Sequence, residues 1–106
     1  MPKLVIGQEE FELNEEGFML APARWNEAIA ITLAKETEGL NLLTDDHWKV
    51  INYIRQYYLQ YSQAPMIRKL CKETGISLKQ VYILFPSGPA KGACKIAGLP
   101  KPSGCV

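Results

Sequence analysis

The chain has 106 residues and a mass of 11.9 kDa, enough for a single domain, residues 1–106, with one modest core. Apolar residues make up 47% of it and charged residues 22%, a globular composition that excludes an intrinsically disordered chain. The longest nearly apolar run, residues 28–34, is far shorter than the roughly 20 residues that cross a bilayer. The N-terminus shows no secretory signal pattern, and three cysteines are too few for a secreted disulfide scaffold. We therefore expect a soluble, cytoplasmic protein.

The net charge of +1 conceals a strong asymmetry. Residues 1–53 carry ten acidic and four basic side chains, whereas residues 54–106 carry one acidic and eight basic ones. The basic segment, residues 54–106, is expected to bind an anionic partner, such as nucleic acid, an acidic protein surface or a small anion. The alternative is a dipolar surface that only keeps the protein soluble.

Residues 1–13 predict a β-hairpin. Leu4 and Ile6 alternate with Val5 before Gly7-Gln8, a pair suited to a two-residue type II′ turn, and after it Phe11 and Leu13 alternate with glutamates. The apolar positions are Leu4, Ile6, Phe11 and Leu13. Because an isolated hairpin is marginally stable in water, this one must pack against the helices that follow.

Residues 23–98 predict a small orthogonal helical bundle, so the fold class is mainly α, in an α+β arrangement with the hairpin. The first helix should end before Gly39, and a second, long helix should begin after Thr44, a good N-cap. The predicted buried stripe of the first helix is Trp25, Ala28, Ile29, Thr32 and Leu33. That of the second is Val50, Ile51, Ile54, Tyr58 and Tyr61.

Three short helices are predicted in the rest of the bundle. One has Pro65 in its first turn and ends at Gly75, the next is capped by Ser77, and the last runs from near Pro89 to Gly98. The residues predicted to face inward are Ile67, Leu70 and Cys71 in the third helix, and Leu78, Val81, Tyr82 and Phe85 in the fourth.

The third and fourth helices, joined by residues 74–77, resemble a helix-turn-helix. In a DNA-binding protein the second helix of such a pair would lie in a major groove. Residues 77–84 offer only Lys79 and Gln80 as exposed base-reading candidates, without the usual Arg or Asn. Since the same helix pair closes many small α cores, DNA binding is an alternative and not the expected function.

Cys71 and His47 are expected to be structural. Cys71 shares an apolar face with core residues, and His47 lies in the first turn of the second helix. Together with Cys94 and Cys105 they could form a four-ligand zinc site, but no Cys-x-x-Cys or His-x-x-x-His pair is present to nucleate it. No glycine-rich phosphate loop follows a strand. We expect the chain to bind no metal and no cofactor.

Residues 99–106 predict a flexible C-terminal arm with no core-forming period. Cys105 is the penultimate residue, and ten residues separate it from Cys94 on the last helix. Two prolines stiffen the arm, and Gly104 removes side-chain bulk directly before the thiol. An extended arm of about 23 Å could carry this thiol into another protein or turn back toward Cys94.

Closing a loop between Cys94 and Cys105 would cost about 3 kcal/mol in chain ordering. A cost of this size suits a bond that is made and broken repeatedly in a reducing compartment. Lys91, Lys95 and Lys101 flank the two sulfurs, and we expect them to favour the thiolates and to attract anionic sulfur species. The alternative is an accidental pair of surface cysteines on a frayed end.

The C-terminal segment GPAKGACKIAGLPKPSGCV closely resembles the signature of the DsrC family, the gamma subunit of dissimilatory sulfite reductase. The wider superfamily includes TusE, a sulfur-relay protein of tRNA thiolation. The resemblance continues through DDHWKVINYIRQYY, the Ala64-Pro65 turn, YILFPSGPA and the NEEGF that follows the hairpin. It spans essentially the whole chain.

The resemblance implies a sulfur-carrying cosubstrate that is not an enzyme by itself. Cys105 would enter the channel of the reductase alpha and beta subunits and approach a sirohaem that belongs to the reductase. Cys94 would pair with it, and sulfite-derived sulfur would be held between them as a trisulfide or persulfide. A membrane complex resembling heterodisulfide reductase would restore the dithiol. Lys91, Lys95, Lys101 and Gly104 would contact the partner or the anionic sulfur species.

The TusE branch keeps the penultimate cysteine but generally lacks the upstream one, so Cys94 favours the DsrC branch. A TusE-like persulfide relay fed by sulfurtransferases is the alternative. The chain departs mildly from the family pattern, with Lys95 in place of Arg and Ser103 in place of Thr. It also lacks an insert that many DsrC chains carry between the third and fourth helices.

Overall fold

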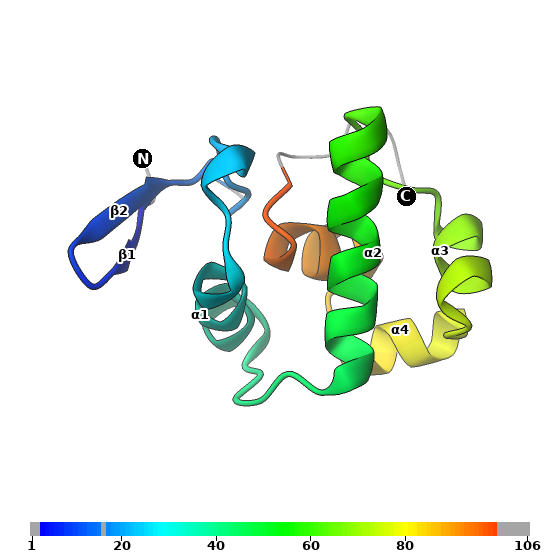
Figure 1. Ribbon diagram of the computed structural model, residues 1–106. Coiled ribbons are helices and arrows are strands. Elements are labelled where there is room, and N and C mark those ends of the chain that lie inside the picture. The colour runs from blue at the N-terminus through cyan, green and yellow to red at the C-terminus, as the bar shows by residue number, and fades with distance from the viewer. Residues whose placement is uncertain (1–2, 16, 100–106) are drawn as a thin grey trace.

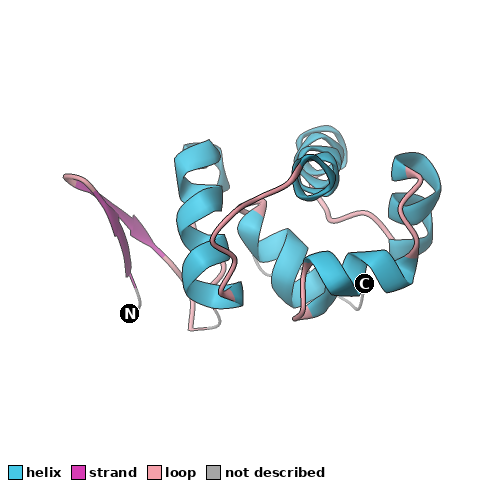
Figure 2. Cartoon of the chain, turned by 90° about the horizontal axis from the view of Figure 1, so that it is seen from below, coloured by secondary structure: helices cyan, strands magenta, loops and turns pink. Residues whose placement is uncertain are grey.

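The computed structural model describes residues 3–15 and 17–99, and its fold is mainly helical with a two-stranded hairpin (Figure 1). The elements in chain order are β1 (Lys3–Ile6), β2 (Glu9–Glu12), η1 (Pro22–Arg24), α1 (Glu27–Glu38), α2 (Asp45–Tyr61), α3 (Ile67–Thr74), α4 (Leu78–Leu84) and η2 (Pro89–Cys94). The hairpin lies at one end of the molecule and α3 and α4 at the other, with α1 and α2 between them (Figures 1 and 2). The predicted fold class is confirmed.

The hairpin has the predicted register. Leu4 pairs with Phe11 across the antiparallel strands, and both side chains are buried. Gly7 has a φ of 61°, the left-handed value that the first position of a type II′ turn requires. The guanidinium of Arg24 stacks on the Phe11 ring at 4.4 Å and donates to the carbonyl of Glu10, which attaches the hairpin to η1.

Short-range signals place the C-terminal end of α1 and the N-terminal end of α2 where they were predicted, but α1 begins at Glu27, so Trp25 lies before the helix and not on it. The Asn26 side chain accepts from the N–H of Ile29 at 3.0 Å, and α1 ends at Gly39 in the left-handed conformation. Thr44 caps α2 by accepting from the N–H of His47, whose Nδ1 in turn accepts from the N–H of Thr44. This reciprocal capping box satisfies donors that a helix N-terminus otherwise leaves open.

The predicted buried stripes are wrong at several positions. Ala28 is exposed, and Tyr61, Leu78 and Tyr82 are each about half exposed. In α1 the predicted Ile29 and Leu33 are buried, but Ala30 and Ala34 complete the buried face, because this helix packs against both β1 and η2. In α4 they are Val81 and Leu84, with Phe85 fully buried just after the helix.

The helix-turn-helix-like pair is present. Gly75 ends α3 in the left-handed conformation, Ile76 is buried, and the Ser77 hydroxyl caps α4. Pro65 is not in the first turn of α3, because Met66 after it is still extended and the helix begins one residue later.

Buried side chains from the hairpin through to Leu99 form one hydrophobic core. Within the described residues, no helix combines the length and apolar character needed to cross a bilayer.

Candidate functional site

Cys94 is the last residue of η2, which is a π-helix. The predicted final helix is thus confirmed in position, but its first part has π geometry, and only Lys95 and Ile96 continue it as α-helix. Wide turns of this kind occur frequently at functional sites.

The loop before η2 is held by α1. Both carboxylate oxygens of Glu38 accept from Ser87, one from its N–H at 2.9 Å and one from its hydroxyl at 2.6 Å. Gly92 packs so closely against this carboxylate and against Phe85 that a Cβ there would lie 2.5 Å from a carboxylate oxygen. The end of α1 therefore fixes the position of the helix that carries Cys94.

After Cys94 the chain forms a Schellman turn, here called the terminal turn (residues 94–99). The N–H of Leu99 donates to the Cys94 carbonyl at 3.2 Å, and the N–H of Gly98 donates to the Lys95 carbonyl at 3.0 Å. Gly98 has a φ of 76°, as the motif requires. Leu99 was predicted to belong to the arm, but it is only 1% exposed and is part of the body.

Two side chains from distant parts of the sequence bind the remaining carbonyls of the terminal turn. Trp25 Nε1–H donates to the Ile96 carbonyl at 2.9 Å, and Arg55 Nη1 donates to the Ala97 carbonyl at 3.2 Å. The Arg55 guanidinium also lies 4.7 Å from the centroid of the Trp25 ring. The four carbonyls from Cys94 to Ala97 therefore all have a donor, so no helix-end acceptor is left buried and unpaired.

The indole of Trp25 also lies against Gly98. A Cβ at Gly98 would overlap the ring, so glycine is required there by space as well as by the positive φ. Trp25 was predicted only as a core residue, and Arg55 was not singled out.

The Cys94 thiol is buried, with 1% exposure, and this burial raises its pKa to about 12. At neutral pH it is a thiol and not a thiolate. The prediction that flanking lysines favour the thiolate is therefore wrong at Cys94. Lys95 instead places its ammonium 5.4 Å from the centroid of the Phe18 ring and beside Gly17, where it exerts no effect strong enough to offset desolvation.

Burial of Cys94 should make stability fall at high pH. The folded protein keeps this thiol neutral up to about pH 12, whereas the unfolded chain releases the proton near the ordinary value of 9.0. The resulting stabilisation is complete below pH 9 and is lost as the pH rises toward 12. Between pH 8 and 10 the wild type should lose roughly 1 kcal/mol more than Cys94→Ala. Urea unfolding of both proteins measures this difference, and equal losses would contradict a buried Cys94.

The other predicted site residues cannot be placed. Cys105, Lys101 and Gly104 lie outside the described residues, as does the side chain of Lys91. Their roles therefore stay predictions.

His47 and Cys71 lie in packed positions. Nδ1 of His47 bonds within the Thr44 cap, Nε2 lies 2.9 Å from the Leu84 carbonyl, and the ring packs edge-on against Phe85. Cys71 is half-buried against the core. Among the residues that the structure describes, no three His, Cys, Asp or Glu side chains gather as a metal site would require.

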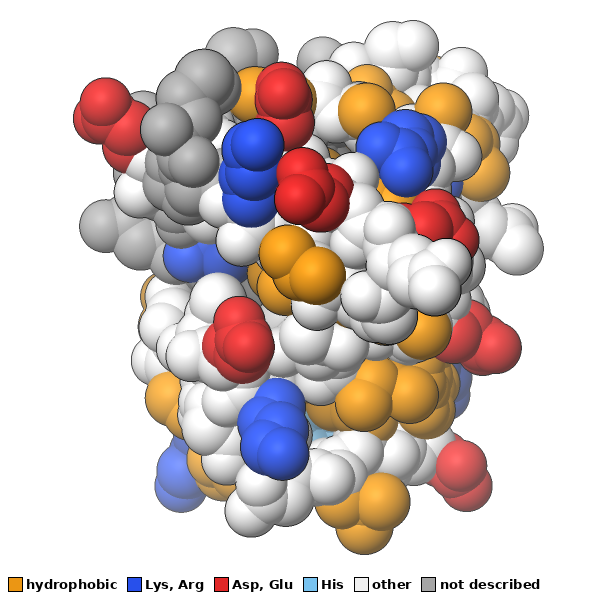
Figure 3. Space-filling view, turned by 90° about the vertical axis from the view of Figure 1, so that its left-hand side faces the viewer, with side chains coloured by type: hydrophobic (Ala, Val, Ile, Leu, Met, Phe, Trp, Pro, Cys, Tyr) orange, Lys and Arg blue, Asp and Glu red, His pale blue; other side chains and the backbone are white. Residues whose placement is uncertain are grey.

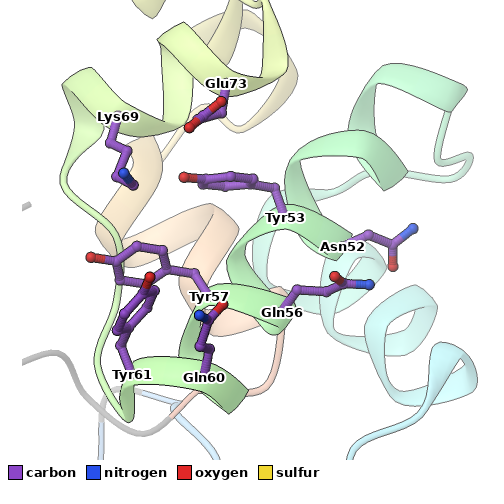
Figure 4. Close-up of a pocket in the computed structure, with 8 residues that line it drawn as sticks. All are labelled: Asn52, Tyr53, Gln56, Tyr57, Gln60, Tyr61, Lys69 and Glu73. Atoms are coloured by element: carbon purple, nitrogen blue, oxygen red, sulfur yellow. The ribbon is translucent and has the colours of Figure 1, made fainter.

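A groove of about 450 Å³ lies between α2 and α3 (Figure 4). Tyr53, Tyr57 and Tyr61 line its α2 side in a row, and Lys69 and Glu73 approach from α3. The Tyr53 hydroxyl is buried and, within the described part of the chain, finds no hydrogen-bond partner. Its pKa is raised, mainly by this burial and then by the charge of Glu73. None of the described residues that line the groove belongs to the terminal turn.

The charge asymmetry of the sequence is distributed between the two ends of the molecule. Acidic side chains are spread over the face formed by the hairpin and α1, among scattered basic and apolar ones (Figure 3). At the other end, α3 carries Arg68, Lys69 and Lys72. The exposed surface of α4 presents Leu78, Tyr82 and Ile83 beside Lys79, which is a more apolar surface than a base-reading helix usually presents.

The fold and the site define a class of protein: a small helical body, led by a β-hairpin, with a buried cysteine at the root of a C-terminal segment that carries a second cysteine. Residues 5–106 match the family model described as "DsrC like protein". The chain belongs to this family.

Relatives of two kinds are similar to the chain. The gamma subunit of dissimilatory-type sulfite reductase from Nitratidesulfovibrio vulgaris is 47% identical over 106 residues and is covered completely, as is this chain. Sulfurtransferase TusE from Escherichia coli K12 is 40% identical over 111 residues, covering 97% of this chain and 99% of its own. The alignment with the gamma subunit from Nitratidesulfovibrio vulgaris is no longer than this chain, so that subunit has no multi-residue insert relative to this chain. The two proteins therefore share the short turn between α3 and α4.

Solved structures agree with this assignment. Dissimilatory sulfite reductase I contains a chain with a TM-score of 0.90 and 46% identity, covering 99% of this chain and 100% of that one. The oxidised gamma subunit (DsrC) from Archaeoglobus fulgidus has a TM-score of 0.88 and 44% identity, with the same coverage.

Proposed function

We propose that this protein is a sulfur-carrying cosubstrate of dissimilatory sulfite reductase, and that it acts in the cytoplasm. The full-length match to a gamma subunit supports the choice of reductase partner. The observation that carries the proposal is the terminal turn. Its last residue, Leu99, is hydrogen-bonded to the Cys94 carbonyl, and Cys105 follows only six residues later in the sequence. The two thiols are thereby tethered through a short segment.

In this proposal Cys105 accepts sulfur and Cys94 resolves the product. Sulfite, the two thiols, four protons and two electrons from the donors of the reductase give a trisulfide and three water molecules. Four further electrons reduce the trisulfide to sulfide and the two thiols, and a membrane complex resembling heterodisulfide reductase would supply them. The buried and protonated Cys94 is a poor nucleophile, so Cys105 is the thiol that meets the sulfur first. Pairing then requires Cys94 to be uncovered.

Mass spectrometry of the protein after turnover with sulfite, an electron donor and the alpha and beta subunits tests the proposal. The wild type should gain one sulfur atom and lose two hydrogens. Cys94→Ser should retain a persulfide on Cys105 without the internal link, and Cys105→Ser should acquire no sulfur. Cys71→Ser is the matched control and should behave as the wild type. Sulfur on Cys105→Ser would overturn the assignment.

A TusE-like persulfide relay is the second candidate, favoured by the 40% identity to TusE proteins. Such a relay would take sulfur from a sulfurtransferase without sulfite, and it would need Cys105 but not Cys94. The presence of Cys94 at a structurally fixed position supports the first candidate. Full sulfur transfer by Cys94→Ser from a persulfidated sulfurtransferase, combined with no uptake from sulfite by the wild type, would decide for the relay.

A further inference from the structure

We propose that Trp25 and Arg55 form a latch that controls access to Cys94. By holding the terminal turn closed they keep the Cys94 thiol covered, and they tilt the Cys94–Cys105 pair toward the dithiol. The redox part of this inference rests on the proposed function, since it requires the two cysteines to pair. The control of access to the Cys94 thiol does not depend on the proposed function.

The cover over Cys94 follows from the geometry of the turn. In a Schellman motif the side chain after the left-handed glycine packs against the residue five positions earlier. Here these residues are Leu99 and Cys94, joined by the 3.2 Å backbone hydrogen bond, and each is 1% exposed. Leu99 therefore covers Cys94 only while the turn keeps its shape.

The latch keeps this shape by supplying two donors that the turn lacks. In the closed turn Ile96 and Ala97 are fully buried, and their carbonyls accept from Trp25 and Arg55. Each lost hydrogen bond would leave a buried carbonyl without a donor. This destabilises the turn more than losing a hydrogen bond to a solvent-exposed carbonyl would. The stacking of the guanidinium on the indole makes the two donors act as a unit.

The three parts of this arrangement come from separate elements. Trp25 precedes α1, Arg55 lies on α2, and the terminal turn follows η2. Gly98 packs directly on the indole, where a Cβ would overlap the ring. Opening the turn therefore means breaking the contacts of the latch, and this uncovers the sulfur that must bond to Cys105.

The redox consequence can be written as an exchange with glutathione. The Cys94 and Cys105 thiols react with glutathione disulfide to form the Cys94–Cys105 disulfide and two glutathione thiols, which take up the two protons. The latch stabilises the reactant side, because it covers Cys94 as a thiol. Weakening the latch should shift this equilibrium toward the protein disulfide.

The test compares Trp25→Phe, which keeps an aromatic ring but deletes the donor, with Trp48→Phe, a matched change at a half-buried tryptophan of α2. The first readout is the rate at which iodoacetamide modifies Cys94, mapped by mass spectrometry on the reduced full chain. Trp25→Phe should raise this rate about tenfold, because the loss of one buried hydrogen bond should make the open turn about ten times more populated. Trp48→Phe should leave the rate unchanged. Cys71, half-buried on α3, is the internal reference and should react at an unchanged rate in both.

The second readout is the glutathione ratio at which half of the protein carries the Cys94–Cys105 disulfide. Trp25→Phe and Arg55→Met should both favour the disulfide by about tenfold, and Arg55→Lys should restore part of the difference. An unchanged Cys94 rate in Trp25→Phe and Arg55→Met, or equal acceleration of Cys71, would overturn the latch. A wild type that never forms the disulfide would overturn the proposed function and the redox role, while the Cys94 rate would still decide whether the latch controls access.

Discussion

Gly98→Ala should lower the free energy of unfolding by about 3 kcal/mol, combining left-handed strain with overpacking. At a φ of 76° any Cβ is unfavourable, and here it would also overlap the Trp25 ring. Displacing that ring would break its hydrogen bond to Ile96. Urea unfolding measures the effect.

Gly75→Ala is the matched control for this substitution. Gly75 has a φ of 74°, but a Cβ there would have no atom within 4 Å. It should therefore cost about 1 kcal/mol, from backbone strain alone. Equal losses in the two variants would show that the indole yields freely and that the terminal turn is not held as described.

Cys94 in the reduced wild type should react with iodoacetamide at pH 8 at least about 1,000-fold more slowly than an exposed cysteine in a short peptide. A pKa of about 12 leaves very little thiolate at this pH, and 1% exposure restricts the reagent further. The measurement is peptide mapping over time. Modification of Cys94 as fast as that of half-buried Cys71 would contradict the burial of the resolving thiol.

The features that depend on neighbouring residues in the chain, such as helix caps and the hairpin turn, were predicted correctly from the sequence. The C-terminal end of α1 follows from Gly39, and the N-terminal ends of α2 and α4 follow from Thr44 and Ser77. Each of these residues acts within one helical turn. The alternation around Gly7 likewise predicted the hairpin register. Which face each helix buries was less predictable, because Ala28 and Ala30 fit a helix equally well and only the neighbours of α1 decide between them.

The candidate site was predicted only in part, and for a related reason. The sequence singled out Cys94, yet it predicted a thiolate favoured by nearby lysines, whereas long-range packing buries the sulfur and turns Lys95 toward Phe18. The roles of Trp25 and Arg55 could not be predicted, because an arginine inside an apolar stripe gives no periodic signal. Their targets lie 71 and 42 residues away in the chain.

These separations have a consequence for the order of folding. Contacts between residues far apart in sequence carry a larger loop-closure cost than local contacts, so they form more slowly. The terminal turn depends on a tryptophan ahead of α1 and an arginine within α2, so it closes after both helices have docked. Until this last step the Cys94 sulfur is uncovered and stays open to oxidants.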